Sequence, residues 1–387
     1  MSIYSFQDQG ERAQFLPGVK RVVVKVGTQL LRGNKRVSAS ERIAELVQAL
    51  DQLRRSGQEV ILVSSGAVGF GMAALGMQQR PRKIACLQAL AALGQSHLMG
   101  CYGSVCEAYG FHCAQLLLTA ADLHDRKRNG HVTQCINALL EKNVLPIINE
   151  NDSVCVDEIK VGDNDTLAAY VASMLRADLT VVLTTVDGML LREEGKDELG
   201  PRLSVVRELT EEVMQMAQGT DGNQFSVGGM ITKLRAAQIV NHSGEALLIA
   251  NGKEFDILTR IMAGEDLGTL FLPARKNRLH ARQRFLAFFS EPTGSLIIDP
   301  GAEKAILKNN RSLLPGGVLG SMGVFHRGDT VLILNSERKE LARGIVNFAF
   351  DEVAKICGKQ SKDLGRLLGR EVDHEEIVHR DFMVLTG

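Results

Sequence analysis

The stretch Arg21-Val22-Val23-Val24-Lys25-Val26-Gly27-Thr28 decides the fold, because it is a continuous β-branched run that ends in a glycine turn. A run this apolar predicts a strand of a parallel sheet that is buried on both faces. Five more such runs follow, at residues 59–63, 114–118, 144–148, 179–183 and 246–249. Helical patterns separate them, at residues 40–55, 83–109, 165–176 and 230–241. This alternation predicts an α/β/α sandwich with a mainly parallel sheet.

The chain has 387 residues, which suits two domains because a domain commonly holds about 100–200 residues. After Leu272 the pattern changes to short strands spaced by glycine-rich turns, with little helix between them. These strands are expected at residues 285–289, 295–298, 323–325, 330–334 and 341–346. We therefore expect an α/β domain at residues 18–274, a basic linker at 275–284 and a small β-rich barrel domain at 285–381.

The composition is that of a globular protein, with 45% hydrophobic and 23% charged residues. Residues 275–387 hold 18 Lys and Arg against 14 Asp and Glu, so the tail carries a net charge of +4.

No uninterrupted apolar run approaches the roughly 18 residues of a membrane helix, and residues 1–11 lack the order of a signal peptide. We expect a cytoplasmic protein without a membrane span. The seven cysteines form no Cys-x-x-Cys pair, which argues against disulfides and zinc.

Three strand or helix ends carry residues suited to anions, and ligands of open parallel sheets bind beyond the carboxyl ends of strands. Lys25 lies inside an apolar strand, where a buried ammonium is costly unless it meets an anion. The second strand runs into Ser64-Ser65-Gly66-Ala67, whose small residues let backbone N–H groups approach an anionic ligand. Such glycine turns are also common without a ligand. Lys233 lies in the first turn of a helix, where the dipole disfavours a cation unless an anion faces it.

The fourth strand leads into the richest polar cluster of the sequence. Asn149-Glu150-Asn151-Asp152 follows it, and Asp163-Asn164-Asp165 comes just before a helix. These amides and carboxylates exceed what a helix cap needs, although Asp165 or Thr166 can be only that cap. Such groups can receive an ammonium, hold a lysine in place or orient metal-bound phosphate. The sequence has no Walker A loop, no Gly-x-Ser-x-Gly elbow and no histidine pair with metal-ligand spacing.

Five motifs together resemble the glutamate 5-kinase family of the amino acid kinase superfamily, at residues 24–28, 65–67, 148–152, 160–165 and 228–233. They follow in the family's order, and the tail resembles the PUA domain that many members carry. The resemblance implies the amino acid kinase fold followed by a PUA-like barrel. It implies ATP-dependent phosphorylation of the side-chain carboxylate of L-glutamate to glutamyl 5-phosphate, the first step of proline biosynthesis. Mg²⁺ is then carried by ATP, with no metal site of the chain.

The resemblance also implies roles for single residues. Lys25 and Lys233 match the pair that flanks the transferred phosphoryl group, and Asp165 matches the carboxylate that holds both. Glutamate contacts are implied at Ser65, Gly66, Asn149, Asp152 and Asn164. ATP contacts are implied at Lys25, Thr184, Thr185, Val227, Gly228, Gly229, Met230, Ile231, Thr232 and Lys233. Thr184-Thr185 replaces the family's usual Thr/Ser-Asp pair, and Met189-Leu190 replaces its Leu-Tyr, which leaves the nucleotide preference open.

The implied partners are L-glutamate, ATP, proline as feedback inhibitor, glutamyl phosphate reductase as a candidate, and further copies of the chain in a homo-oligomer. Two alternatives stay open. One is another amino acid kinase, acting on acetylglutamate, aspartate, carbamate or UMP. The cluster at residues 149–152 argues against this alternative. The other is an RNA-binding PUA protein with a disused kinase scaffold, because PUA domains bind RNA elsewhere and the tail is basic. The tail has few aromatic residues for base stacking, so we expect weak, salt-dependent RNA binding.

Overall fold

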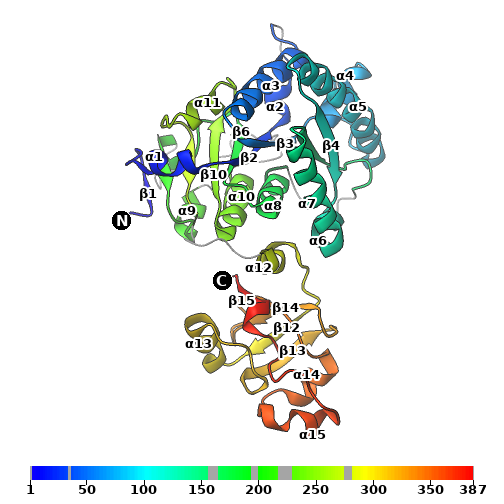
Figure 1. Cartoon of the computed structure of the whole chain (residues 1–387), viewed down its shortest axis with the longest axis vertical. Coiled ribbons are helices and arrows are strands. Elements are labelled where there is room, and N and C mark those ends of the chain that lie inside the picture. The colour runs from blue at the N-terminus through cyan, green and yellow to red at the C-terminus, as the bar shows by residue number, and fades with distance from the viewer. Residues whose placement is uncertain are drawn as a thin grey trace. The chain divides into compact units, whose positions relative to one another are not determined.

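The computed structural model describes residues 2–33, 36–155, 164–192, 199–216, 229–273 and 281–386. The chain divides into two compact units. The first unit holds residues 1–123 and 127–278, and the second holds residues 124–126 and 279–387. Figure 1 colours the first unit mainly from blue to yellow-green and the second mainly from yellow to red.

The first unit is built on a nine-stranded sheet. Its strands are β1 (Tyr4–Ser5), β2 (Arg21–Val26), β3 (Glu59–Ser64), β4 (Cys113–Leu118), β5 (Leu145–Glu150), β6 (Leu179–Thr184), β9 (Val205–Val206), β10 (Ala246–Asn251) and β11 (Thr269–Phe271). The order across the sheet is β1-β9-β11-β10-β6-β2-β3-β5-β4. The six strands from β10 to β4 run parallel, while β1–β9 and β10–β11 pair antiparallel. The mainly parallel sheet is confirmed, and each of its six predicted strands is found within two residues.

Helices cover both faces of this sheet. They are α1 (Glu11–Phe15), α2 (Thr28–Leu31), α3 (Ala39–Arg55), α4 (Ala67–Ala74), α5 (Ile84–Ala108), α6 (Ala120–His124), α7 (Arg126–Glu141), α8 (Asn164–Leu175), α9 (Glu211–Met216), α10 (Met230–Ser243) and α11 (Ile257–Met262). Helices α3, α5 and α11 share one apolar core with the sheet. Helices α8 and α10 pack against each other and against the strands, as Figure 1 shows. The α/β/α sandwich is therefore confirmed.

Helix α5 is, within the described ranges, the one helix long and apolar enough to cross a membrane by length and composition. The mean hydropathy of its most apolar 18-residue window is 1.2. Its residues Leu98, Tyr102 and Cys106 are nevertheless fully buried in the core of the first unit. Of that window, 28% is buried inside the structure.

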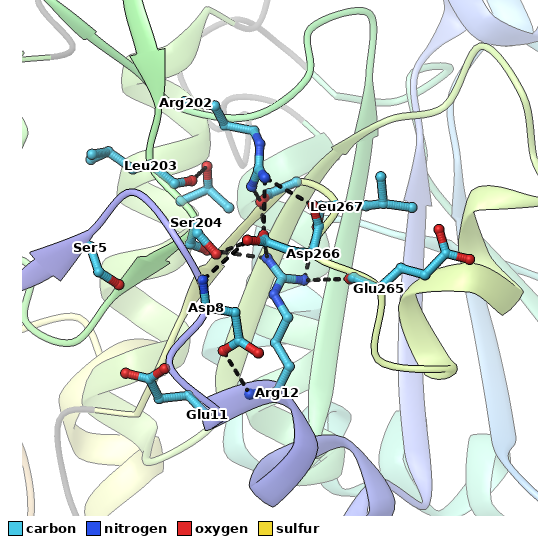
Figure 2. A network of polar contacts seen from close by, with 12 residues as sticks. Ser5, Asp8, Glu11, Arg12, Arg202, Leu203, Ser204, Glu265, Asp266 and Leu267 are labelled. Atoms are coloured by element: carbon cyan, nitrogen blue, oxygen red, sulfur yellow. Dashed lines mark hydrogen bonds and ion pairs between the residues drawn. The ribbon is translucent and has the colours of Figure 1, made fainter.

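A buried arginine connects the N-terminal segment to the sheet through hydrogen bonds. Arg12 is 0% exposed, and its guanidinium donates hydrogen bonds to the backbone carbonyls of Ser204, Glu265, Leu267 and Gly268 (Figure 2). The carboxylate of Asp266 lies 3.4 Å from the same guanidinium. Burial lowers the pKa of Arg12, and the charge of Asp266 opposes this shift. The guanidinium therefore links the start of the chain to the turns that lead into β9 and β11.

The second unit holds a mixed five-stranded sheet of order β13-β12-β14-β15-β16. The strands are β12 (Gly294–Ile298), β13 (Val318–Gly323), β14 (Thr330–Leu334), β15 (Glu340–Ile345) and β16 (Met383–Leu385). Strands β12 and β14 pair in parallel, and the other pairs are antiparallel. The helices of this unit are α12 (Ala281–Arg284), α13 (Pro300–Asn309), α14 (Phe350–Ile356) and α15 (Leu364–Leu368). The expected small β-rich domain is confirmed as a mixed β-sheet domain.

Three expectations for the tail are wrong. Residues 285–289 are not a strand but a π-helical turn after α12, closed by a hydrogen bond of 2.9 Å from Ser290 N to Phe285 O. An all-apolar Phe-Leu-Ala-Phe-Phe run has no periodicity that separates helix from strand. The strand expected at 323–325 lies earlier, because β13 ends at Gly323 with a φ of +88°. Helices α13, α14 and α15 contradict the expectation of little helix.

Of the predicted linker, residues 281–284 form α12, and residues 275–280 lie outside the described ranges.

Candidate active site

The predicted site residues of the first unit gather at the carboxyl edge of its parallel sheet. Lys25 is the fifth residue of β2, Ser65 directly follows β3, and Asn149 lies in β5. Asp165 and Lys233 come from the first turns of α8 and α10. A hydrogen bond of 3.1 Å from Ser65 N to Val26 O ties the ends of β2 and β3 together. Parallel strands bring residues far apart in the sequence to one edge, so the expected convergence is found.

Two lysines share one buried carboxylate. Lys25 Nζ lies 2.7 Å from Asp165 Oδ1, and Lys233 Nζ lies 3.1 Å from Asp165 Oδ2. The three residues are 8%, 5% and 0% exposed for Lys25, Lys233 and Asp165. The hydroxyl of Thr232 lies 3.1 Å from Asp165 Oδ2 and 2.8 Å from Gly229 O, and its single hydrogen is shared between these two acceptors. Lys25 and Lys233 were each expected to face an anion, and both face the carboxylate of Asp165.

The two lysines keep the carboxyl group of Asp165 ionised. Burial raises the pKa of Asp165, but the ammonium groups of Lys25 and Lys233 outweigh burial and lower the pKa below its usual value. Asp165 is therefore ionised at neutral pH. The two ammonium groups and the carboxylate thus meet at a place that is almost closed to water. Such an arrangement suits a ligand that brings negative charge between the lysines.

A second group of side chains forms a hydrogen-bonded row beside the lysines. Asn164 Nδ2 donates to Ser65 Oγ at 2.6 Å and to Asn149 Oδ1 at 3.0 Å. Asn149 Nδ2 in turn donates to Gln95 Oε1 at 3.0 Å. Gln95 lies on α5, and it belongs to none of the motifs predicted from the sequence. Sequence reasoning thus found three of the four members of this row.

The turn between β3 and α4 needs a glycine. Gly66 has a φ of +116°, a conformation that side-chain-bearing residues rarely adopt, and it directly precedes α4. Asp152 lies in the turn that follows β5 and is half-buried. Residues 160–163 of the predicted acidic motif lie outside the described residues. The residues expected to contact the phosphoryl acceptor, here called the acceptor side, are Ser65, Gly66, Asn149, Asp152 and Asn164, and all of them lie in the described part of the chain.

The expected nucleotide contacts lie at the ends of β6 and at the start of α10. Thr184 is the last residue of β6, and Thr185 follows it at the surface. Gly229 precedes α10, whose first four residues are Met230, Ile231, Thr232 and Lys233. Val227 and Gly228 lie outside the described residues. In the part of the chain that the structure describes, no group of three or more His, Cys, Asp or Glu side chains is placed to hold a metal ion.

The parallel α/β/α sandwich with two lysines on one carboxylate at its carboxyl edge lies within residues 20–251, which match the amino acid kinase family. Residues 294–368 match the PUA domain. The chain is 42% identical to the glutamate 5-kinase of Caldanaerobacter subterraneus subsp. tengcongensis, over 94% of this chain and 97% of that protein. It is also 42% identical to the glutamate 5-kinase of Desulfotalea psychrophila, over 97% of this chain and 99% of that protein. The chain belongs to the glutamate 5-kinase family, with its amino acid kinase and PUA domains.

A solved structure of carbamate kinase from Giardia lamblia bound to AMP-PNP is also similar to this chain. It has 19% sequence identity and a TM-score of 0.45, and the match covers 66% of this chain and 99% of that one.

Proposed function

We propose that this protein transfers the γ-phosphoryl group of ATP to the side-chain carboxylate of L-glutamate, giving glutamyl 5-phosphate and ADP for proline biosynthesis. The observation that carries the proposal is the buried cluster of Lys25, Lys233 and Asp165 beside the row of Ser65, Asn149 and Asn164. The first group suits a phosphoryl group in transfer, and the second suits the polar end of an amino acid. The family membership of the chain supports the same reaction.

The reaction needs charge neutralisation more than proton transfer. An oxygen of the glutamate carboxylate, already ionised at neutral pH, attacks the γ-phosphorus, and the bond to the bridging oxygen of ADP breaks. The electron pair of that bond leaves with ADP, so no general base is required. Lys25 and Lys233 stabilise the negative charge that spreads over the transferred group. Asp165 holds the two ammonium groups in place and keeps them from repelling each other apart.

The remaining contacts divide between the two substrates. We assign the α-amino and α-carboxylate groups of glutamate to Ser65, Gly66, Asn149, Asp152 and Asn164. We assign ATP to Lys25, Thr184, Thr185 and the segment 227–233. Thr185 and the pair Met189-Leu190 differ from the residues that are usual in the family at the expected adenine and ribose contacts.

Mg²⁺ enters this proposal as part of the nucleotide. When bound, it neutralises charge on the β- and γ-phosphate oxygens. Both oxygens of Asp165 are already engaged by lysines, which fits a metal that is carried by ATP and not by that carboxylate. The chain's own contribution is the pair of ammonium groups.

The wider setting follows from the same assignment. We propose that residues 18–274 form the kinase domain, residues 275–284 the linker and residues 285–381 the PUA-like domain. Proline, which shares its α-carboxylate and amine nitrogen with glutamate, is the expected feedback inhibitor and should compete with glutamate. We expect the protein to be cytoplasmic and to form a homo-oligomer. Glutamyl phosphate reductase is the candidate enzyme that uses its product. RNA binding by the basic tail is expected to be weak and salt-dependent.

The proposal is tested by measuring ADP release with ATP, Mg²⁺ and a panel of acids: glutamate, acetylglutamate, aspartate, carbamate and UMP. Turnover with glutamate alone is the expected result, and turnover with another acid instead would refute the substrate. Lys25→Ala and Lys233→Ala should each lower kcat by about 10² to 10³, the usual cost of one preorganised electrostatic group. Lys142→Ala, at an exposed position directly after α7, is the matched control and should retain wild-type turnover.

A further inference from the structure

Three polar side chains form a stripe along the mostly apolar helix α5. Gln88, Gln95 and Tyr102 are spaced by seven residues, which places them on one face of the helix. Each contacts a different segment at or next to the acceptor side. Gln88 Nε2 donates to Cys155 O at 3.3 Å, Gln95 Oε1 accepts from Asn149 at 3.0 Å, and the Tyr102 hydroxyl lies 2.9 Å from Ser64 Oγ. The stripe therefore connects α5 to the ends of β3 and β5 and to the loop after β5.

Two glycines let α5 pack close to α4, the helix that starts at the site. A Cβ atom on Gly94 would lie 1.8 Å from Ala67 O, and one on Gly71 would lie 2.1 Å from Leu90 O. Both clashes are with backbone atoms, which cannot move aside as a side chain can. Helices α4 and α5 lie side by side in Figure 1. The close packing holds the residue after Gly94, which is Gln95, at a fixed depth beneath the site.

We propose that Gln95 is a positioning residue for the amino acid substrate, acting through Asn149. This inference rests on the proposed function, because it takes the row of Ser65, Asn149 and Asn164 as the place where the α-amino acid end of glutamate binds. Gln95 is 7% exposed and is separated from Ser65 by two side chains in the row. Its effect on the substrate is therefore indirect.

The direction of each hydrogen bond in the row is fixed from one end. The backbone N–H of Glu150 donates to the Asn149 side chain at 2.9 Å, so the atom that faces it is the oxygen. The Asn149 amide nitrogen must then face Gln95, and only the side-chain oxygen of Gln95 can accept from it. The Asn149 oxygen is left to accept from Asn164. Gln95 and the Glu150 N–H thus hold the Asn149 amide from opposite sides.

This polarity decides what the row offers to a ligand. Asn164 uses both hydrogens of its amide nitrogen, one toward Asn149 Oδ1 and one toward Ser65 Oγ. Ser65 accepts in this bond, so its own hydroxyl hydrogen is directed elsewhere and can donate to a carboxylate. The carbonyl oxygen of Asn164 takes part in none of these bonds and can accept from an ammonium. The row therefore presents a donor and an acceptor that match the two charged groups of an α-amino acid.

Removing the acceptor at Gln95 should disturb this arrangement without touching the lysines. In Gln95→Met the side chain keeps its length but loses its oxygen. The buried Asn149 amide nitrogen then has no acceptor at this position, and we expect the Asn149 side chain to rotate toward another acceptor. We expect the KM for glutamate to rise about tenfold, the factor that corresponds to the loss of one hydrogen bond. The KM for ATP should change by less than about twofold, because the nucleotide residues lie on other elements.

A matched control separates positioning from stability. Asn241 on α10 is also a buried amide, 4% exposed, and donates to the carbonyls of Glu245 and Phe271 away from the row. Asn241→Leu should lower the melting temperature as Gln95→Met does, yet leave the glutamate KM unchanged. If both variants raised the glutamate KM equally, or if Gln95→Met left it at the wild-type value, the positioning role would be refuted.

A double-mutant cycle tests whether Gln95 acts through Asn149. On an Asn149→Ala background, adding Gln95→Met should change kcat/KM for glutamate by less than about twofold, because the row is already broken. Full multiplication of the two effects would contradict the proposal and indicate a separate structural role. Failure of the wild-type protein to turn over glutamate would instead overturn the proposed function, so the two failures are distinguishable.

Discussion

Replacing Asp165 with asparagine removes the charge that holds the two site lysines together, with almost no change in side-chain volume. The carboxylate oxygens lie 2.7 Å from Lys25 Nζ and 3.1 Å from Lys233 Nζ. At an effective dielectric constant of about 20, these two attractions correspond to about 6 and about 5 kcal/mol before the cost of desolvation. Breaking a buried ion pair by removing one partner typically costs about 3–5 kcal/mol. Asp165→Asn should therefore leave two ammonium groups that repel each other and drift from their positions.

The expected result is a kcat lowered by about 10² to 10³, because preorganised charge in a site closed to water is lost. ADP release at saturating ATP and glutamate measures this, at a temperature where circular dichroism shows the variant folded. Asp51→Asn on α3 is the matched control. Asp51 is also buried between two cations, at 2.6 Å from Arg55 and 3.7 Å from Arg54, but it lies outside the site. If Asp165→Asn kept wild-type kcat, the electrostatic role of the cluster would be refuted.

The lowered pKa of Asp165 also predicts a pH dependence of stability. A carboxyl group with a depressed pKa in the folded state stabilises the fold above its unfolded pKa, about 3.9, and loses this contribution as the pH falls toward the folded value. The difference in melting temperature between wild type and Asp165→Asn should therefore shrink as the pH is lowered below about 4. A difference that grew on acidification would contradict the assigned direction of the shift.

Further predictions concern the acceptor side, the N-terminal anchor and the tail. Asp152→Ala and Asn164→Ala should chiefly raise the KM for glutamate, and a lowered kcat with unchanged KM would show that the acceptor side is misassigned. Arg12→Met should lower the free energy of unfolding by about 3 kcal/mol in urea titrations, because four backbone carbonyls lose a buried donor, while the KM for both substrates stays unchanged. A chain truncated after Ala274 should retain glutamate kinase activity with an altered response to proline or Mg²⁺, and a folded but inactive truncated chain would contradict this.

The parallel sheet was predictable because its strands are buried on both faces and stand out as continuous apolar runs. Residues 21–26 were predicted to the residue. Strands β1 and β9, of two residues each, were missed, because so short a segment has no periodicity. The π-helical turn at residues 285–289 was misread for the same reason. The helix content of the tail depends on packing that no local pattern contains.

In the site, the sequence indicated residues whose chemistry is costly in their local setting. A lysine in an apolar strand and a lysine in the first turn of a helix both need an anion, and Asp165 lies between them. Gln95 gave no such signal, because a glutamine inside a helix is ordinary until the strands it faces are known. Its spacing of seven residues from Gln88 and Tyr102 is the one pattern that marks it, and that pattern gains meaning only once α5 is placed against β3 and β5.

The central claim is that an oxygen of the glutamate side chain attacks the γ-phosphorus at the Lys25, Lys233 and Asp165 cluster. Glutamate labelled with ¹⁸O in its side-chain carboxylate tests this directly when the wild-type protein turns over with ATP and Mg²⁺ in the presence of hydroxylamine. Hydroxylamine attacks the carbonyl carbon of the acyl phosphate, so the released phosphate keeps the bridging oxygen. We predict one ¹⁸O atom per released phosphate by mass spectrometry, from fully labelled glutamate. Unlabelled phosphate would show that water or another group is the acceptor, and would contradict the account.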